Sequence, residues 1–195
     1  MSITVAEPQA VVDLIHSSQA PLLARPYYQG SDPGPIVAAL AHVPEVLEVA
    51  MPFISALYGP SALPVRLKEI VVVRTSAHLE CRYCIESHSV VALDAGFSCS
   101  EILGLRDLDD TVRERWSSDE AGEPVLMEWI DAVAGATGSV SKDSARRLRE
   151  YFSDAEIVEL TVLIGATMML NRFCTALGLP SSNGTLERLR AEDLL

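Results

Sequence analysis

Residues 64–88 read PVRLKEIVVVRTSAHLECRYCIESH, and the first part of this stretch decides the fold class. The run Val71–Val73 would suit a buried strand if it stood alone. However, the segment 64–79 is longer than a typical strand, and no turn residue interrupts it before the first cysteine. We therefore predict a helix over 64–79 and a second helix over 82–95, which ends at Gly96.

Helical signals continue on both sides of these two segments. Ser153 and Glu156 have the spacing of a capping box, which predicts the start of a long helix that runs to about Leu177. Gly178 and Pro180 are typical of the end of such a helix. Further helices are expected over 36–42, 44–58, a short segment capped by Ser98, 107–116, 124–135 and 142–151, the last capped by Ser141. No convincing β-hairpin appears, so we predict an all-α fold, a single-domain helical bundle.

The N-terminal part of the chain differs from the rest in composition. Residues 1–35 contain five prolines and the turn-rich sequence QGSDPGP. We expect an extended arm over 1–35 with at most one short helix near 7–16, followed by one all-helical domain over 36–195. Such an arm either lies on its own domain or wraps around a neighbouring subunit, and the sequence leaves both arrangements open.

Composition and charge narrow the possible partners and location. The chain has 195 residues and a formal net charge of −12. A negative field of this size repels nucleic acids and anionic membrane surfaces, so we expect neither as a partner. The N-terminus lacks the features of a signal peptide, and the apolar stretch 157–170 is shorter than the roughly 20 residues that span a bilayer. We therefore expect a cytoplasmic protein.

The chain contains four cysteines, and two of them form a CxxC sequence. Structural disulfides are rare in the cytosol, so Cys81 and Cys84 are better explained as catalytic, redox-active or metal-binding residues. Cys99 and Cys174 are expected to behave as small apolar residues.

The spacing around the CxxC sequence indicates how its thiols could react. A helix over 82–95 puts Cys81 at its cap and Cys84 in its first turn, where unpaired amides favour a thiolate. Spacings of three and four place both cysteines and His88 on one stripe, so His88 can take a proton from Cys84. We therefore predict that Cys84 is the attacking thiol and Cys81 the resolving thiol. Glu69 could orient His88 as the third element of an activated nucleophile, although a solvated carboxylate is the alternative.

This pattern is typical of a dithiol redox centre, with peroxide as the expected oxidant and a thiol-dependent peroxidase as the expected function. In the expected cycle, the Cys84 thiolate becomes a sulfenic acid, and Cys81 condenses with it to form a disulfide. Two other functions remain open. A protein disulfide could replace the peroxide, or His78, Cys81, Cys84 and His88 could bind zinc in a helical module without turnover.

The same residues carry a resemblance to a known family. A glutamate, eleven residues, CxxC, three residues and a histidine resemble the active-site motif of the alkylhydroperoxidase D-like branch of the carboxymuconolactone decarboxylase family. Glu69, Cys81, Cys84 and His88 match this motif position by position. The segments 153–160, 171–173 and 176–178 are also similar to the closing helix of many members, so that the resemblance extends over about 35–180.

The resemblance implies an all-helical fold and peroxidase or disulfide-exchange activity, with the four matched residues as the catalytic set. It also implies an external thiol or dithiol reductant, no required cofactor, and homo-oligomers that are often trimers or hexamers. One position departs from the pattern, because Tyr83 stands where the best-known branch has a second histidine. A phenol with a pKa of about 10 is a poor base at neutral pH, so we expect Tyr83 to pack or to line a channel.

Overall fold

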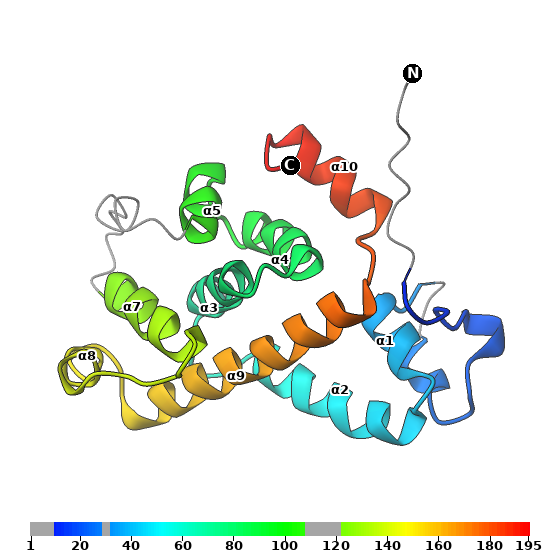
Figure 1. Cartoon of the computed structure of the whole chain (residues 1–195), viewed down its shortest axis with the longest axis horizontal. Coiled ribbons are helices and arrows are strands. Elements are labelled where there is room, and N and C mark those ends of the chain that lie inside the picture. The colour runs from blue at the N-terminus through cyan, green and yellow to red at the C-terminus, as the bar shows by residue number, and fades with distance from the viewer. Residues whose placement is uncertain (1–9, 29–31, 108–121) are drawn as a thin grey trace.

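The computed structural model describes residues 10–28, 32–107 and 122–195 of the chain. Throughout these ranges every regular element is a helix and none is a strand, which confirms the predicted all-α fold (Figure 1). Two short 3₁₀ helices come first, and nine α-helices follow them in the described residues. Their bounds are η1 Ser17–Gln19, η2 Arg25–Tyr27, α1 Pro35–Leu40, α2 Pro44–Tyr58, α3 Val65–His78, α4 Arg82–Asp94, α5 Cys99–Arg106, α7 Gly122–Ala134, α8 Lys142–Leu148, α9 Asp154–Leu177 and α10 Asn183–Ala191.

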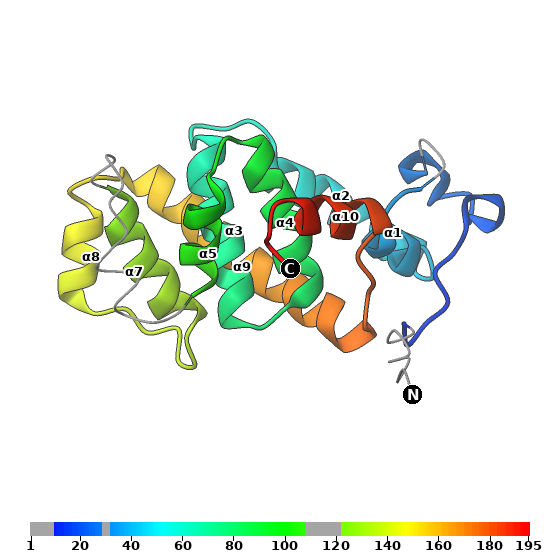
Figure 2. The ribbon, with the colours of Figure 1, turned by 90° about the horizontal axis from the view of Figure 1, so that it is seen from above.

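Helix α3 lies at the centre of the fold. Every residue from 67 to 77 is buried, and the helix packs against α4, α5, α7 and α9 (Figure 1 and Figure 2). A helix that is covered on all sides needs apolar residues around its whole circumference, whereas a surface helix needs them on one face only. The valine run at 71–73 therefore belongs to a buried helix and not to a strand.

The charged side chains that α3 buries each have an ionisable partner. Lys68 Nζ lies 3.2 Å from a carboxylate oxygen of Glu159. Arg74 Nε lies 2.7 Å from a carboxylate oxygen of Asp131. Glu69 is paired with a histidine of α4, as described below. Such pairing is needed because an uncompensated buried charge costs several kcal/mol.

Helix α9 is 24 residues long and crosses the molecule from α8 to the N-terminal segment (Figure 1). It begins at the predicted capping box, in which Ser153 and Glu156 bond reciprocally, and it ends at Gly178, whose φ is 62°. Of the helices in the described residues, α9 alone is long and apolar enough to cross a membrane. It packs against α2, α3, α4 and α7.

Residues 10–28 lie on the helices of their own chain. The Val11 amide donates a hydrogen bond of 2.9 Å to the carbonyl of Leu177, at the end of α9. The Ile15 amide donates one of 3.2 Å to the carbonyl of Ala38 in α1. These contacts hold the segment against α1 and the end of α9. The division into an arm over 1–35 and a domain over 36–195 remains a prediction.

Some predicted elements differ from the observed ones. The short helix expected near 7–16 is absent over 10–16, because amides of this segment bond to α1 and α9, and residues 7–9 lie outside the described ranges. The helix expected over 107–116 also falls outside the described residues from 108 onward. Helix α8 ends three residues earlier than predicted, and α10 has no counterpart among the predicted helices.

Candidate functional site

The turn between α3 and α4 positions the CxxC sequence. Helix α3 ends at His78, and Cys81 is the N-cap residue of α4. The Cys81 amide donates to the carbonyl of Ser76 at 3.0 Å, and Glu80 adopts a positive φ of 52°, so the chain reverses between the helices. The two helices therefore pack as a hairpin, which brings side chains of α3 next to those of α4.

The hairpin brings Glu69 and His88 together. His88 Nδ1 lies 3.0 Å from Oε2 of Glu69, and the two form an ion pair when the imidazole is protonated. Glu69 is only 4% exposed, so the alternative of a solvated carboxylate is wrong. The ring of Tyr58 in α2 lies 5.5 Å from the imidazole and helps to enclose the pair.

The two sulfurs of the CxxC sequence are in direct contact. Cys81 Sγ and Cys84 Sγ are 2.7 Å apart and share a hydrogen bond, and both thiols are free. Cys81 has no exposed surface, whereas Cys84 is 6% exposed. The pair is therefore close enough to form a disulfide with little rearrangement.

A third thiol, that of Cys174 in α9, completes this cluster. Cys174 is 1% exposed and packs in the same buried cluster as Cys81, Cys84 and Leu179. Its thiol is also close enough to the other two to shift the pKa of each. Cys174 is therefore buried among apolar residues as expected, and its place beside the other two thiols is what the sequence did not predict. We call Cys81, Cys84 and Cys174 the three-thiol cluster.

The three-thiol cluster holds a negative charge on Cys81. The pKa of Cys81 is lowered to about 3, first by a hydrogen bond with the Cys174 thiol and next by one with the Cys84 thiol. The hydrogen bond with Cys174 also lowers the pKa of Cys84, but the bond with Cys81 and burial outweigh it and raise this pKa to about 12. Hydrogen bonds with Cys81 and Cys84 raise the pKa of Cys174, and burial adds to this. The hydrogen bonds within the cluster thus favour a thiolate at Cys81, whereas the position of His88 favours one at Cys84.

Two further polar side chains border the cluster. Asn171 is buried in α9, donates from Nδ2 to Ser76 Oγ at 3.1 Å and acts to lower the pKa of Cys84. Burial raises the pKa of Tyr83 to about 12, so its phenol stays neutral at physiological pH and cannot serve as a base.

The four ligands of the zinc alternative are not brought together. His78 Nε2 lies 2.6 Å from Oδ1 of Asp131, away from the thiols, and His88 is paired with Glu69. In the part of the chain that the structure describes, no group of three or more His, Cys, Asp or Glu side chains is arranged to hold a metal ion.

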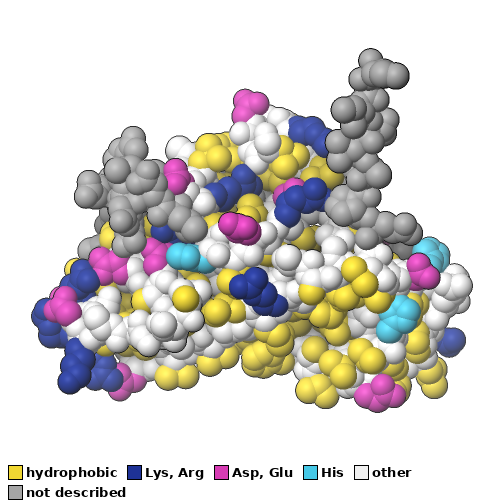
Figure 3. Space-filling view, in the orientation of Figure 1, with side chains coloured by type: hydrophobic (Ala, Val, Ile, Leu, Met, Phe, Trp, Pro, Cys, Tyr) yellow, Lys and Arg dark blue, Asp and Glu magenta, His cyan; other side chains and the backbone are white. Residues whose placement is uncertain are grey.

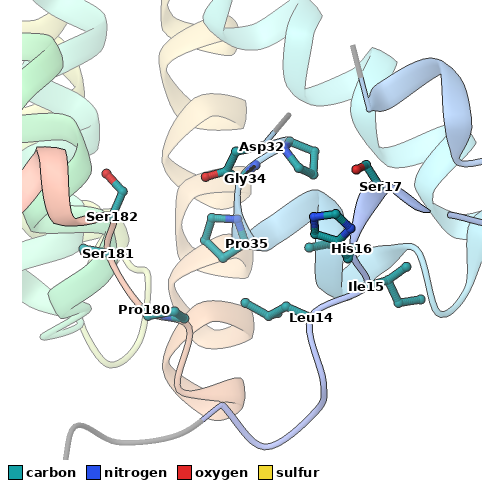
Figure 4. A pocket seen from close by; sticks show the side chains of 12 residues that line it. Leu14, Ile15, His16, Ser17, Asp32, Gly34, Pro35, Pro180, Ser181 and Ser182 are labelled. Atoms are coloured by element: carbon teal, nitrogen blue, oxygen red, sulfur yellow. Dashed lines mark hydrogen bonds between the residues drawn. The ribbon is translucent and has the colours of Figure 1, made fainter. Parts of the chain in front are cut away.

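Two hollows lie at the same end of α9. The hollow beside the thiols has a volume of about 290 Å³ and is lined by Cys81, Tyr83, Cys174 and the residues that end α9. A larger one, of about 390 Å³, lies between the N-terminal segment and the chain after α9, with Leu14, His16 and Pro180 in its wall (Figure 4). None of the predicted site residues lines the larger hollow, so the smaller one is associated with the chemistry.

Comparison with known proteins supports the resemblance seen in the sequence. Residues 44–112 match the carboxymuconolactone decarboxylase family. No curated protein matches the chain.

Several solved structures share the fold. An uncharacterized peroxidase-related protein from Ralstonia eutropha JMP134, described as an alkylhydroperoxidase AhpD core, is 18% identical with a TM-score of 0.77, covering 92% of this chain and 96% of that one. A protein from Agrobacterium tumefaciens, described as a putative antioxidant defence protein AhpD, is 27% identical with a TM-score of 0.65, covering 74% and 95%. The debrominase Bmp8, solved with 2,3,4-tribromopyrrole, is 17% identical with a TM-score of 0.68, covering 94% and 100%. The match over residues 44–112 thus relates this part of the chain to the carboxymuconolactone decarboxylase family, and the helical fold of the chain is similar to that of alkylhydroperoxidase AhpD-like proteins.

Proposed function

We propose that this protein is a thiol-dependent peroxidase that reduces hydroperoxides with the dithiol of Cys81 and Cys84. The observation that carries the proposal is the contact of two buried sulfurs beside a paired glutamate and histidine. A dithiol of this kind alternates between two thiols and a disulfide, and it needs no bound cofactor to do so. The fold relatives described as peroxidase-related or as antioxidant defence proteins support a role of this general kind.

Cys84 is the thiol that meets the peroxide in this proposal. It retains exposed surface where Cys81 has none, and it lies one helical turn before His88. The Cys84 proton leaves as Cys84 attacks, and the relay of His88 and Glu69 accepts it. Cys81, whose sulfur is 2.7 Å away, is the resolving thiol.

The chemical cycle then has two steps within the protein. The Cys84 thiolate attacks one peroxide oxygen and the O–O bond breaks, so that Cys84 is oxidised to a sulfenic acid while the hydroperoxide is reduced to an alcohol or water. Cys81 attacks the sulfenic sulfur, which forms the Cys81–Cys84 disulfide and releases water. An external thiol or dithiol reduces the disulfide and completes the cycle.

His88 and Glu69 act on the leaving oxygen in this proposal. In the described residues, His88 makes no direct hydrogen bond to either sulfur, so we assign its proton to the departing alkoxide. Glu69 holds the imidazole through Nδ1, which leaves Nε2 to face the substrate. We further propose that the protein works in the cytoplasm as a homo-oligomer, without nucleic acid or membrane partners.

The test is the intact mass of the reduced protein after denaturing alkylation, with and without one equivalent of an organic hydroperoxide. We expect the rapid loss of two alkylatable thiols in the wild type. Cys84→Ser should lose none, whereas Cys81→Ser should undergo one oxidation and then stall. If all thiols of the wild type stay alkylatable, the peroxidase proposal is wrong, and equal behaviour of the two variants would void the assigned roles.

The same assay tests the relay. Glu69→Gln keeps the shape of the side chain but removes its charge, and we expect disulfide formation to slow by about 10- to 100-fold because the proton is delivered less efficiently. Glu86→Gln is the matched control, since Glu86 is a buried glutamate of α4 that bonds to Ser181 outside the site. Equal rates for the two variants would remove Glu69 from the relay.

The assay also separates the peroxidase from a disulfide-exchange protein. An exchange protein would lose the same two thiols on incubation with an oxidised protein substrate but would react slowly with the hydroperoxide. We expect the opposite order of rates.

A further inference from the structure

The thiol of Cys174 has no part in the cycle above, although it lies in the same cluster. It comes from α9, whereas Cys81 and Cys84 come from the start of α4, and the packing of α4 on α9 brings them together. The Cys174 side chain lies in the same buried cluster as both cysteines, and both of them shift its pKa. A thiol packed beside a disulfide can exchange with it.

The hollow beside the site distinguishes the three sulfurs. Cys81 and Cys174 both line the hollow of about 290 Å³, and Cys84 does not. The wall also contains the exposed residues Arg82 and Thr175, so the hollow opens to the surface. A disulfide between Cys81 and Cys174 would therefore lie on this hollow, while a Cys81–Cys84 disulfide would have one sulfur turned away from it.

We propose that Cys174 is a third redox thiol, which takes over the disulfide from Cys84 and presents it to the reductant in the hollow. This inference rests on the proposed function, because it begins from the Cys81–Cys84 disulfide that the peroxidase cycle produces. Cys174 then returns Cys84 to its thiol form before the external reductant arrives.

The step is a thiol–disulfide exchange in which no net oxidation occurs. The Cys174 sulfur attacks the Cys81 sulfur of the Cys81–Cys84 disulfide, so a Cys81–Cys174 bond forms and the Cys81–Cys84 bond breaks. Cys84 leaves as a thiolate and takes up the proton that Cys174 loses. The external thiol or dithiol finally reduces the Cys81–Cys174 disulfide.

The experiment maps disulfides by trypsin digestion, for which the sequence is well suited. Cleavage after Arg74, Arg82, Arg106, Arg172 and Arg188 places Cys81 in peptide 75–82, Cys84 in 83–106 and Cys174 in 173–188. Cys99 also falls in peptide 83–106, so all measurements use a Cys99→Ser parent protein. This substitution lies outside the three-thiol cluster. The parent is oxidised with diamide, which converts dithiols to disulfides without any peroxide, and is then quenched in acid and alkylated.

We expect peptide 75–82 of the parent to be linked partly to 83–106 and partly to 173–188. In the Cys84→Ser variant of this parent, 75–82 should be linked to 173–188 alone, with loss of both remaining alkylatable thiols. If the parent shows only the link to 83–106, the inference is overturned, whatever the variant shows.

A second arm of the experiment keeps the two proposals apart. The same parent is treated with one equivalent of hydroperoxide instead of diamide. A link between 75–82 and 173–188 under diamide, with all thiols still reduced under hydroperoxide, would retain the third thiol and reject the peroxidase. Disulfide formation under hydroperoxide, with no link between 75–82 and 173–188 under either oxidant, would retain the peroxidase and reject the third thiol.

Discussion

At the scale of single residues, hydrogen bonds among three thiols favour a negative charge in a site that solvent hardly reaches. Burial alone raises the pKa of a thiol, because the thiolate loses its hydration. In this cluster, hydrogen bonds with Cys174 and Cys84 reverse that direction for Cys81. Cys81 also stands at the N-cap of α4, where the helix end carries partial positive charge. The site therefore holds a thiolate at neutral pH while its other two thiols stay protonated.

We expect this thiolate to persist well below neutral pH. The pKa of Cys81 is lowered to about 3, so the thiolate is present above that value and is lost as the pH falls through it, whereas an ordinary thiol titrates near pH 8.5. Ultraviolet thiolate absorbance between about pH 9 and about pH 5 should retain a component in the wild type that Cys81→Ser lacks. Cys174→Ala removes the strongest hydrogen-bond partner and should move the titration toward the ordinary range. A wild-type signal that disappears entirely between about pH 9 and about pH 7 would contradict the assignment.

At the scale of helices, local capping signals set where several elements begin. Ser98, Ser141 and Ser153 each accept a hydrogen bond from the amide three residues later, and α5, α8 and α9 begin at these caps as predicted. Helix α10 has a cap of the same kind, since Ser182 accepts a hydrogen bond from the Thr185 amide, so its start was also predictable, whereas its packing depends on contacts distant in sequence. Leu189 of α10 enters the core, and Arg106 donates a hydrogen bond of 2.6 Å to the carbonyl of Leu194 just beyond the helix.

The site residues likewise fall into those that local sequence predicts and those that only the packing of distant helices brings together. Cys81, Cys84 and His88 lie within one short helical stretch, so their shared stripe follows from helix periodicity. The approach of Glu69 to His88 follows once α3 and α4 are recognised as a hairpin. Cys174 comes from a distant helix and carries no motif, so only the packing of α9 against α4 reveals its place.

The turn before Cys81 allows a prediction about backbone strain. Glu80 has a φ of 52°, in the left-handed region where a residue other than glycine costs roughly 1 kcal/mol or more. We expect Glu80→Gly to have a free energy of unfolding about 1 kcal/mol higher than that of Glu80→Ala, because glycine relieves this cost whereas alanine keeps it. Urea denaturation of both variants and the wild type measures the difference. Coincident midpoints for the two variants would show that the turn is not strained.

At the scale of the whole molecule, an apolar surface remains uncovered over α2 and α9. Hydrophobic side chains gather along the lower edge of the view in Figure 3, where these two helices lie. The exposed apolar residues of the two helices are Val46, Val49, Phe53, Val158, Val162 and Met169. Their spacings place them on one face of each helix, and the two helices pack against each other. Contiguous apolar patches of this kind are typical of protein interaction sites.

We predict that this surface joins copies of the chain in the proposed homo-oligomer. Val49 is 73% exposed and fills no part of the core, so Val49→Glu should leave the fold of one chain intact. In an interface, the same change would bury an unpaired charge at a cost of several kcal/mol, and the oligomer should dissociate. Light scattering after size-exclusion chromatography should give the wild type a multiple of 21.1 kDa and the variant the mass of a single chain.

Leu103→Glu is the matched control, since Leu103 is an exposed apolar residue of α5, near the opposite edge of the molecule in Figure 1. Loss of assembly in both variants would point to a general effect of added charge, whereas an unchanged mass for Val49→Glu would place the interface elsewhere.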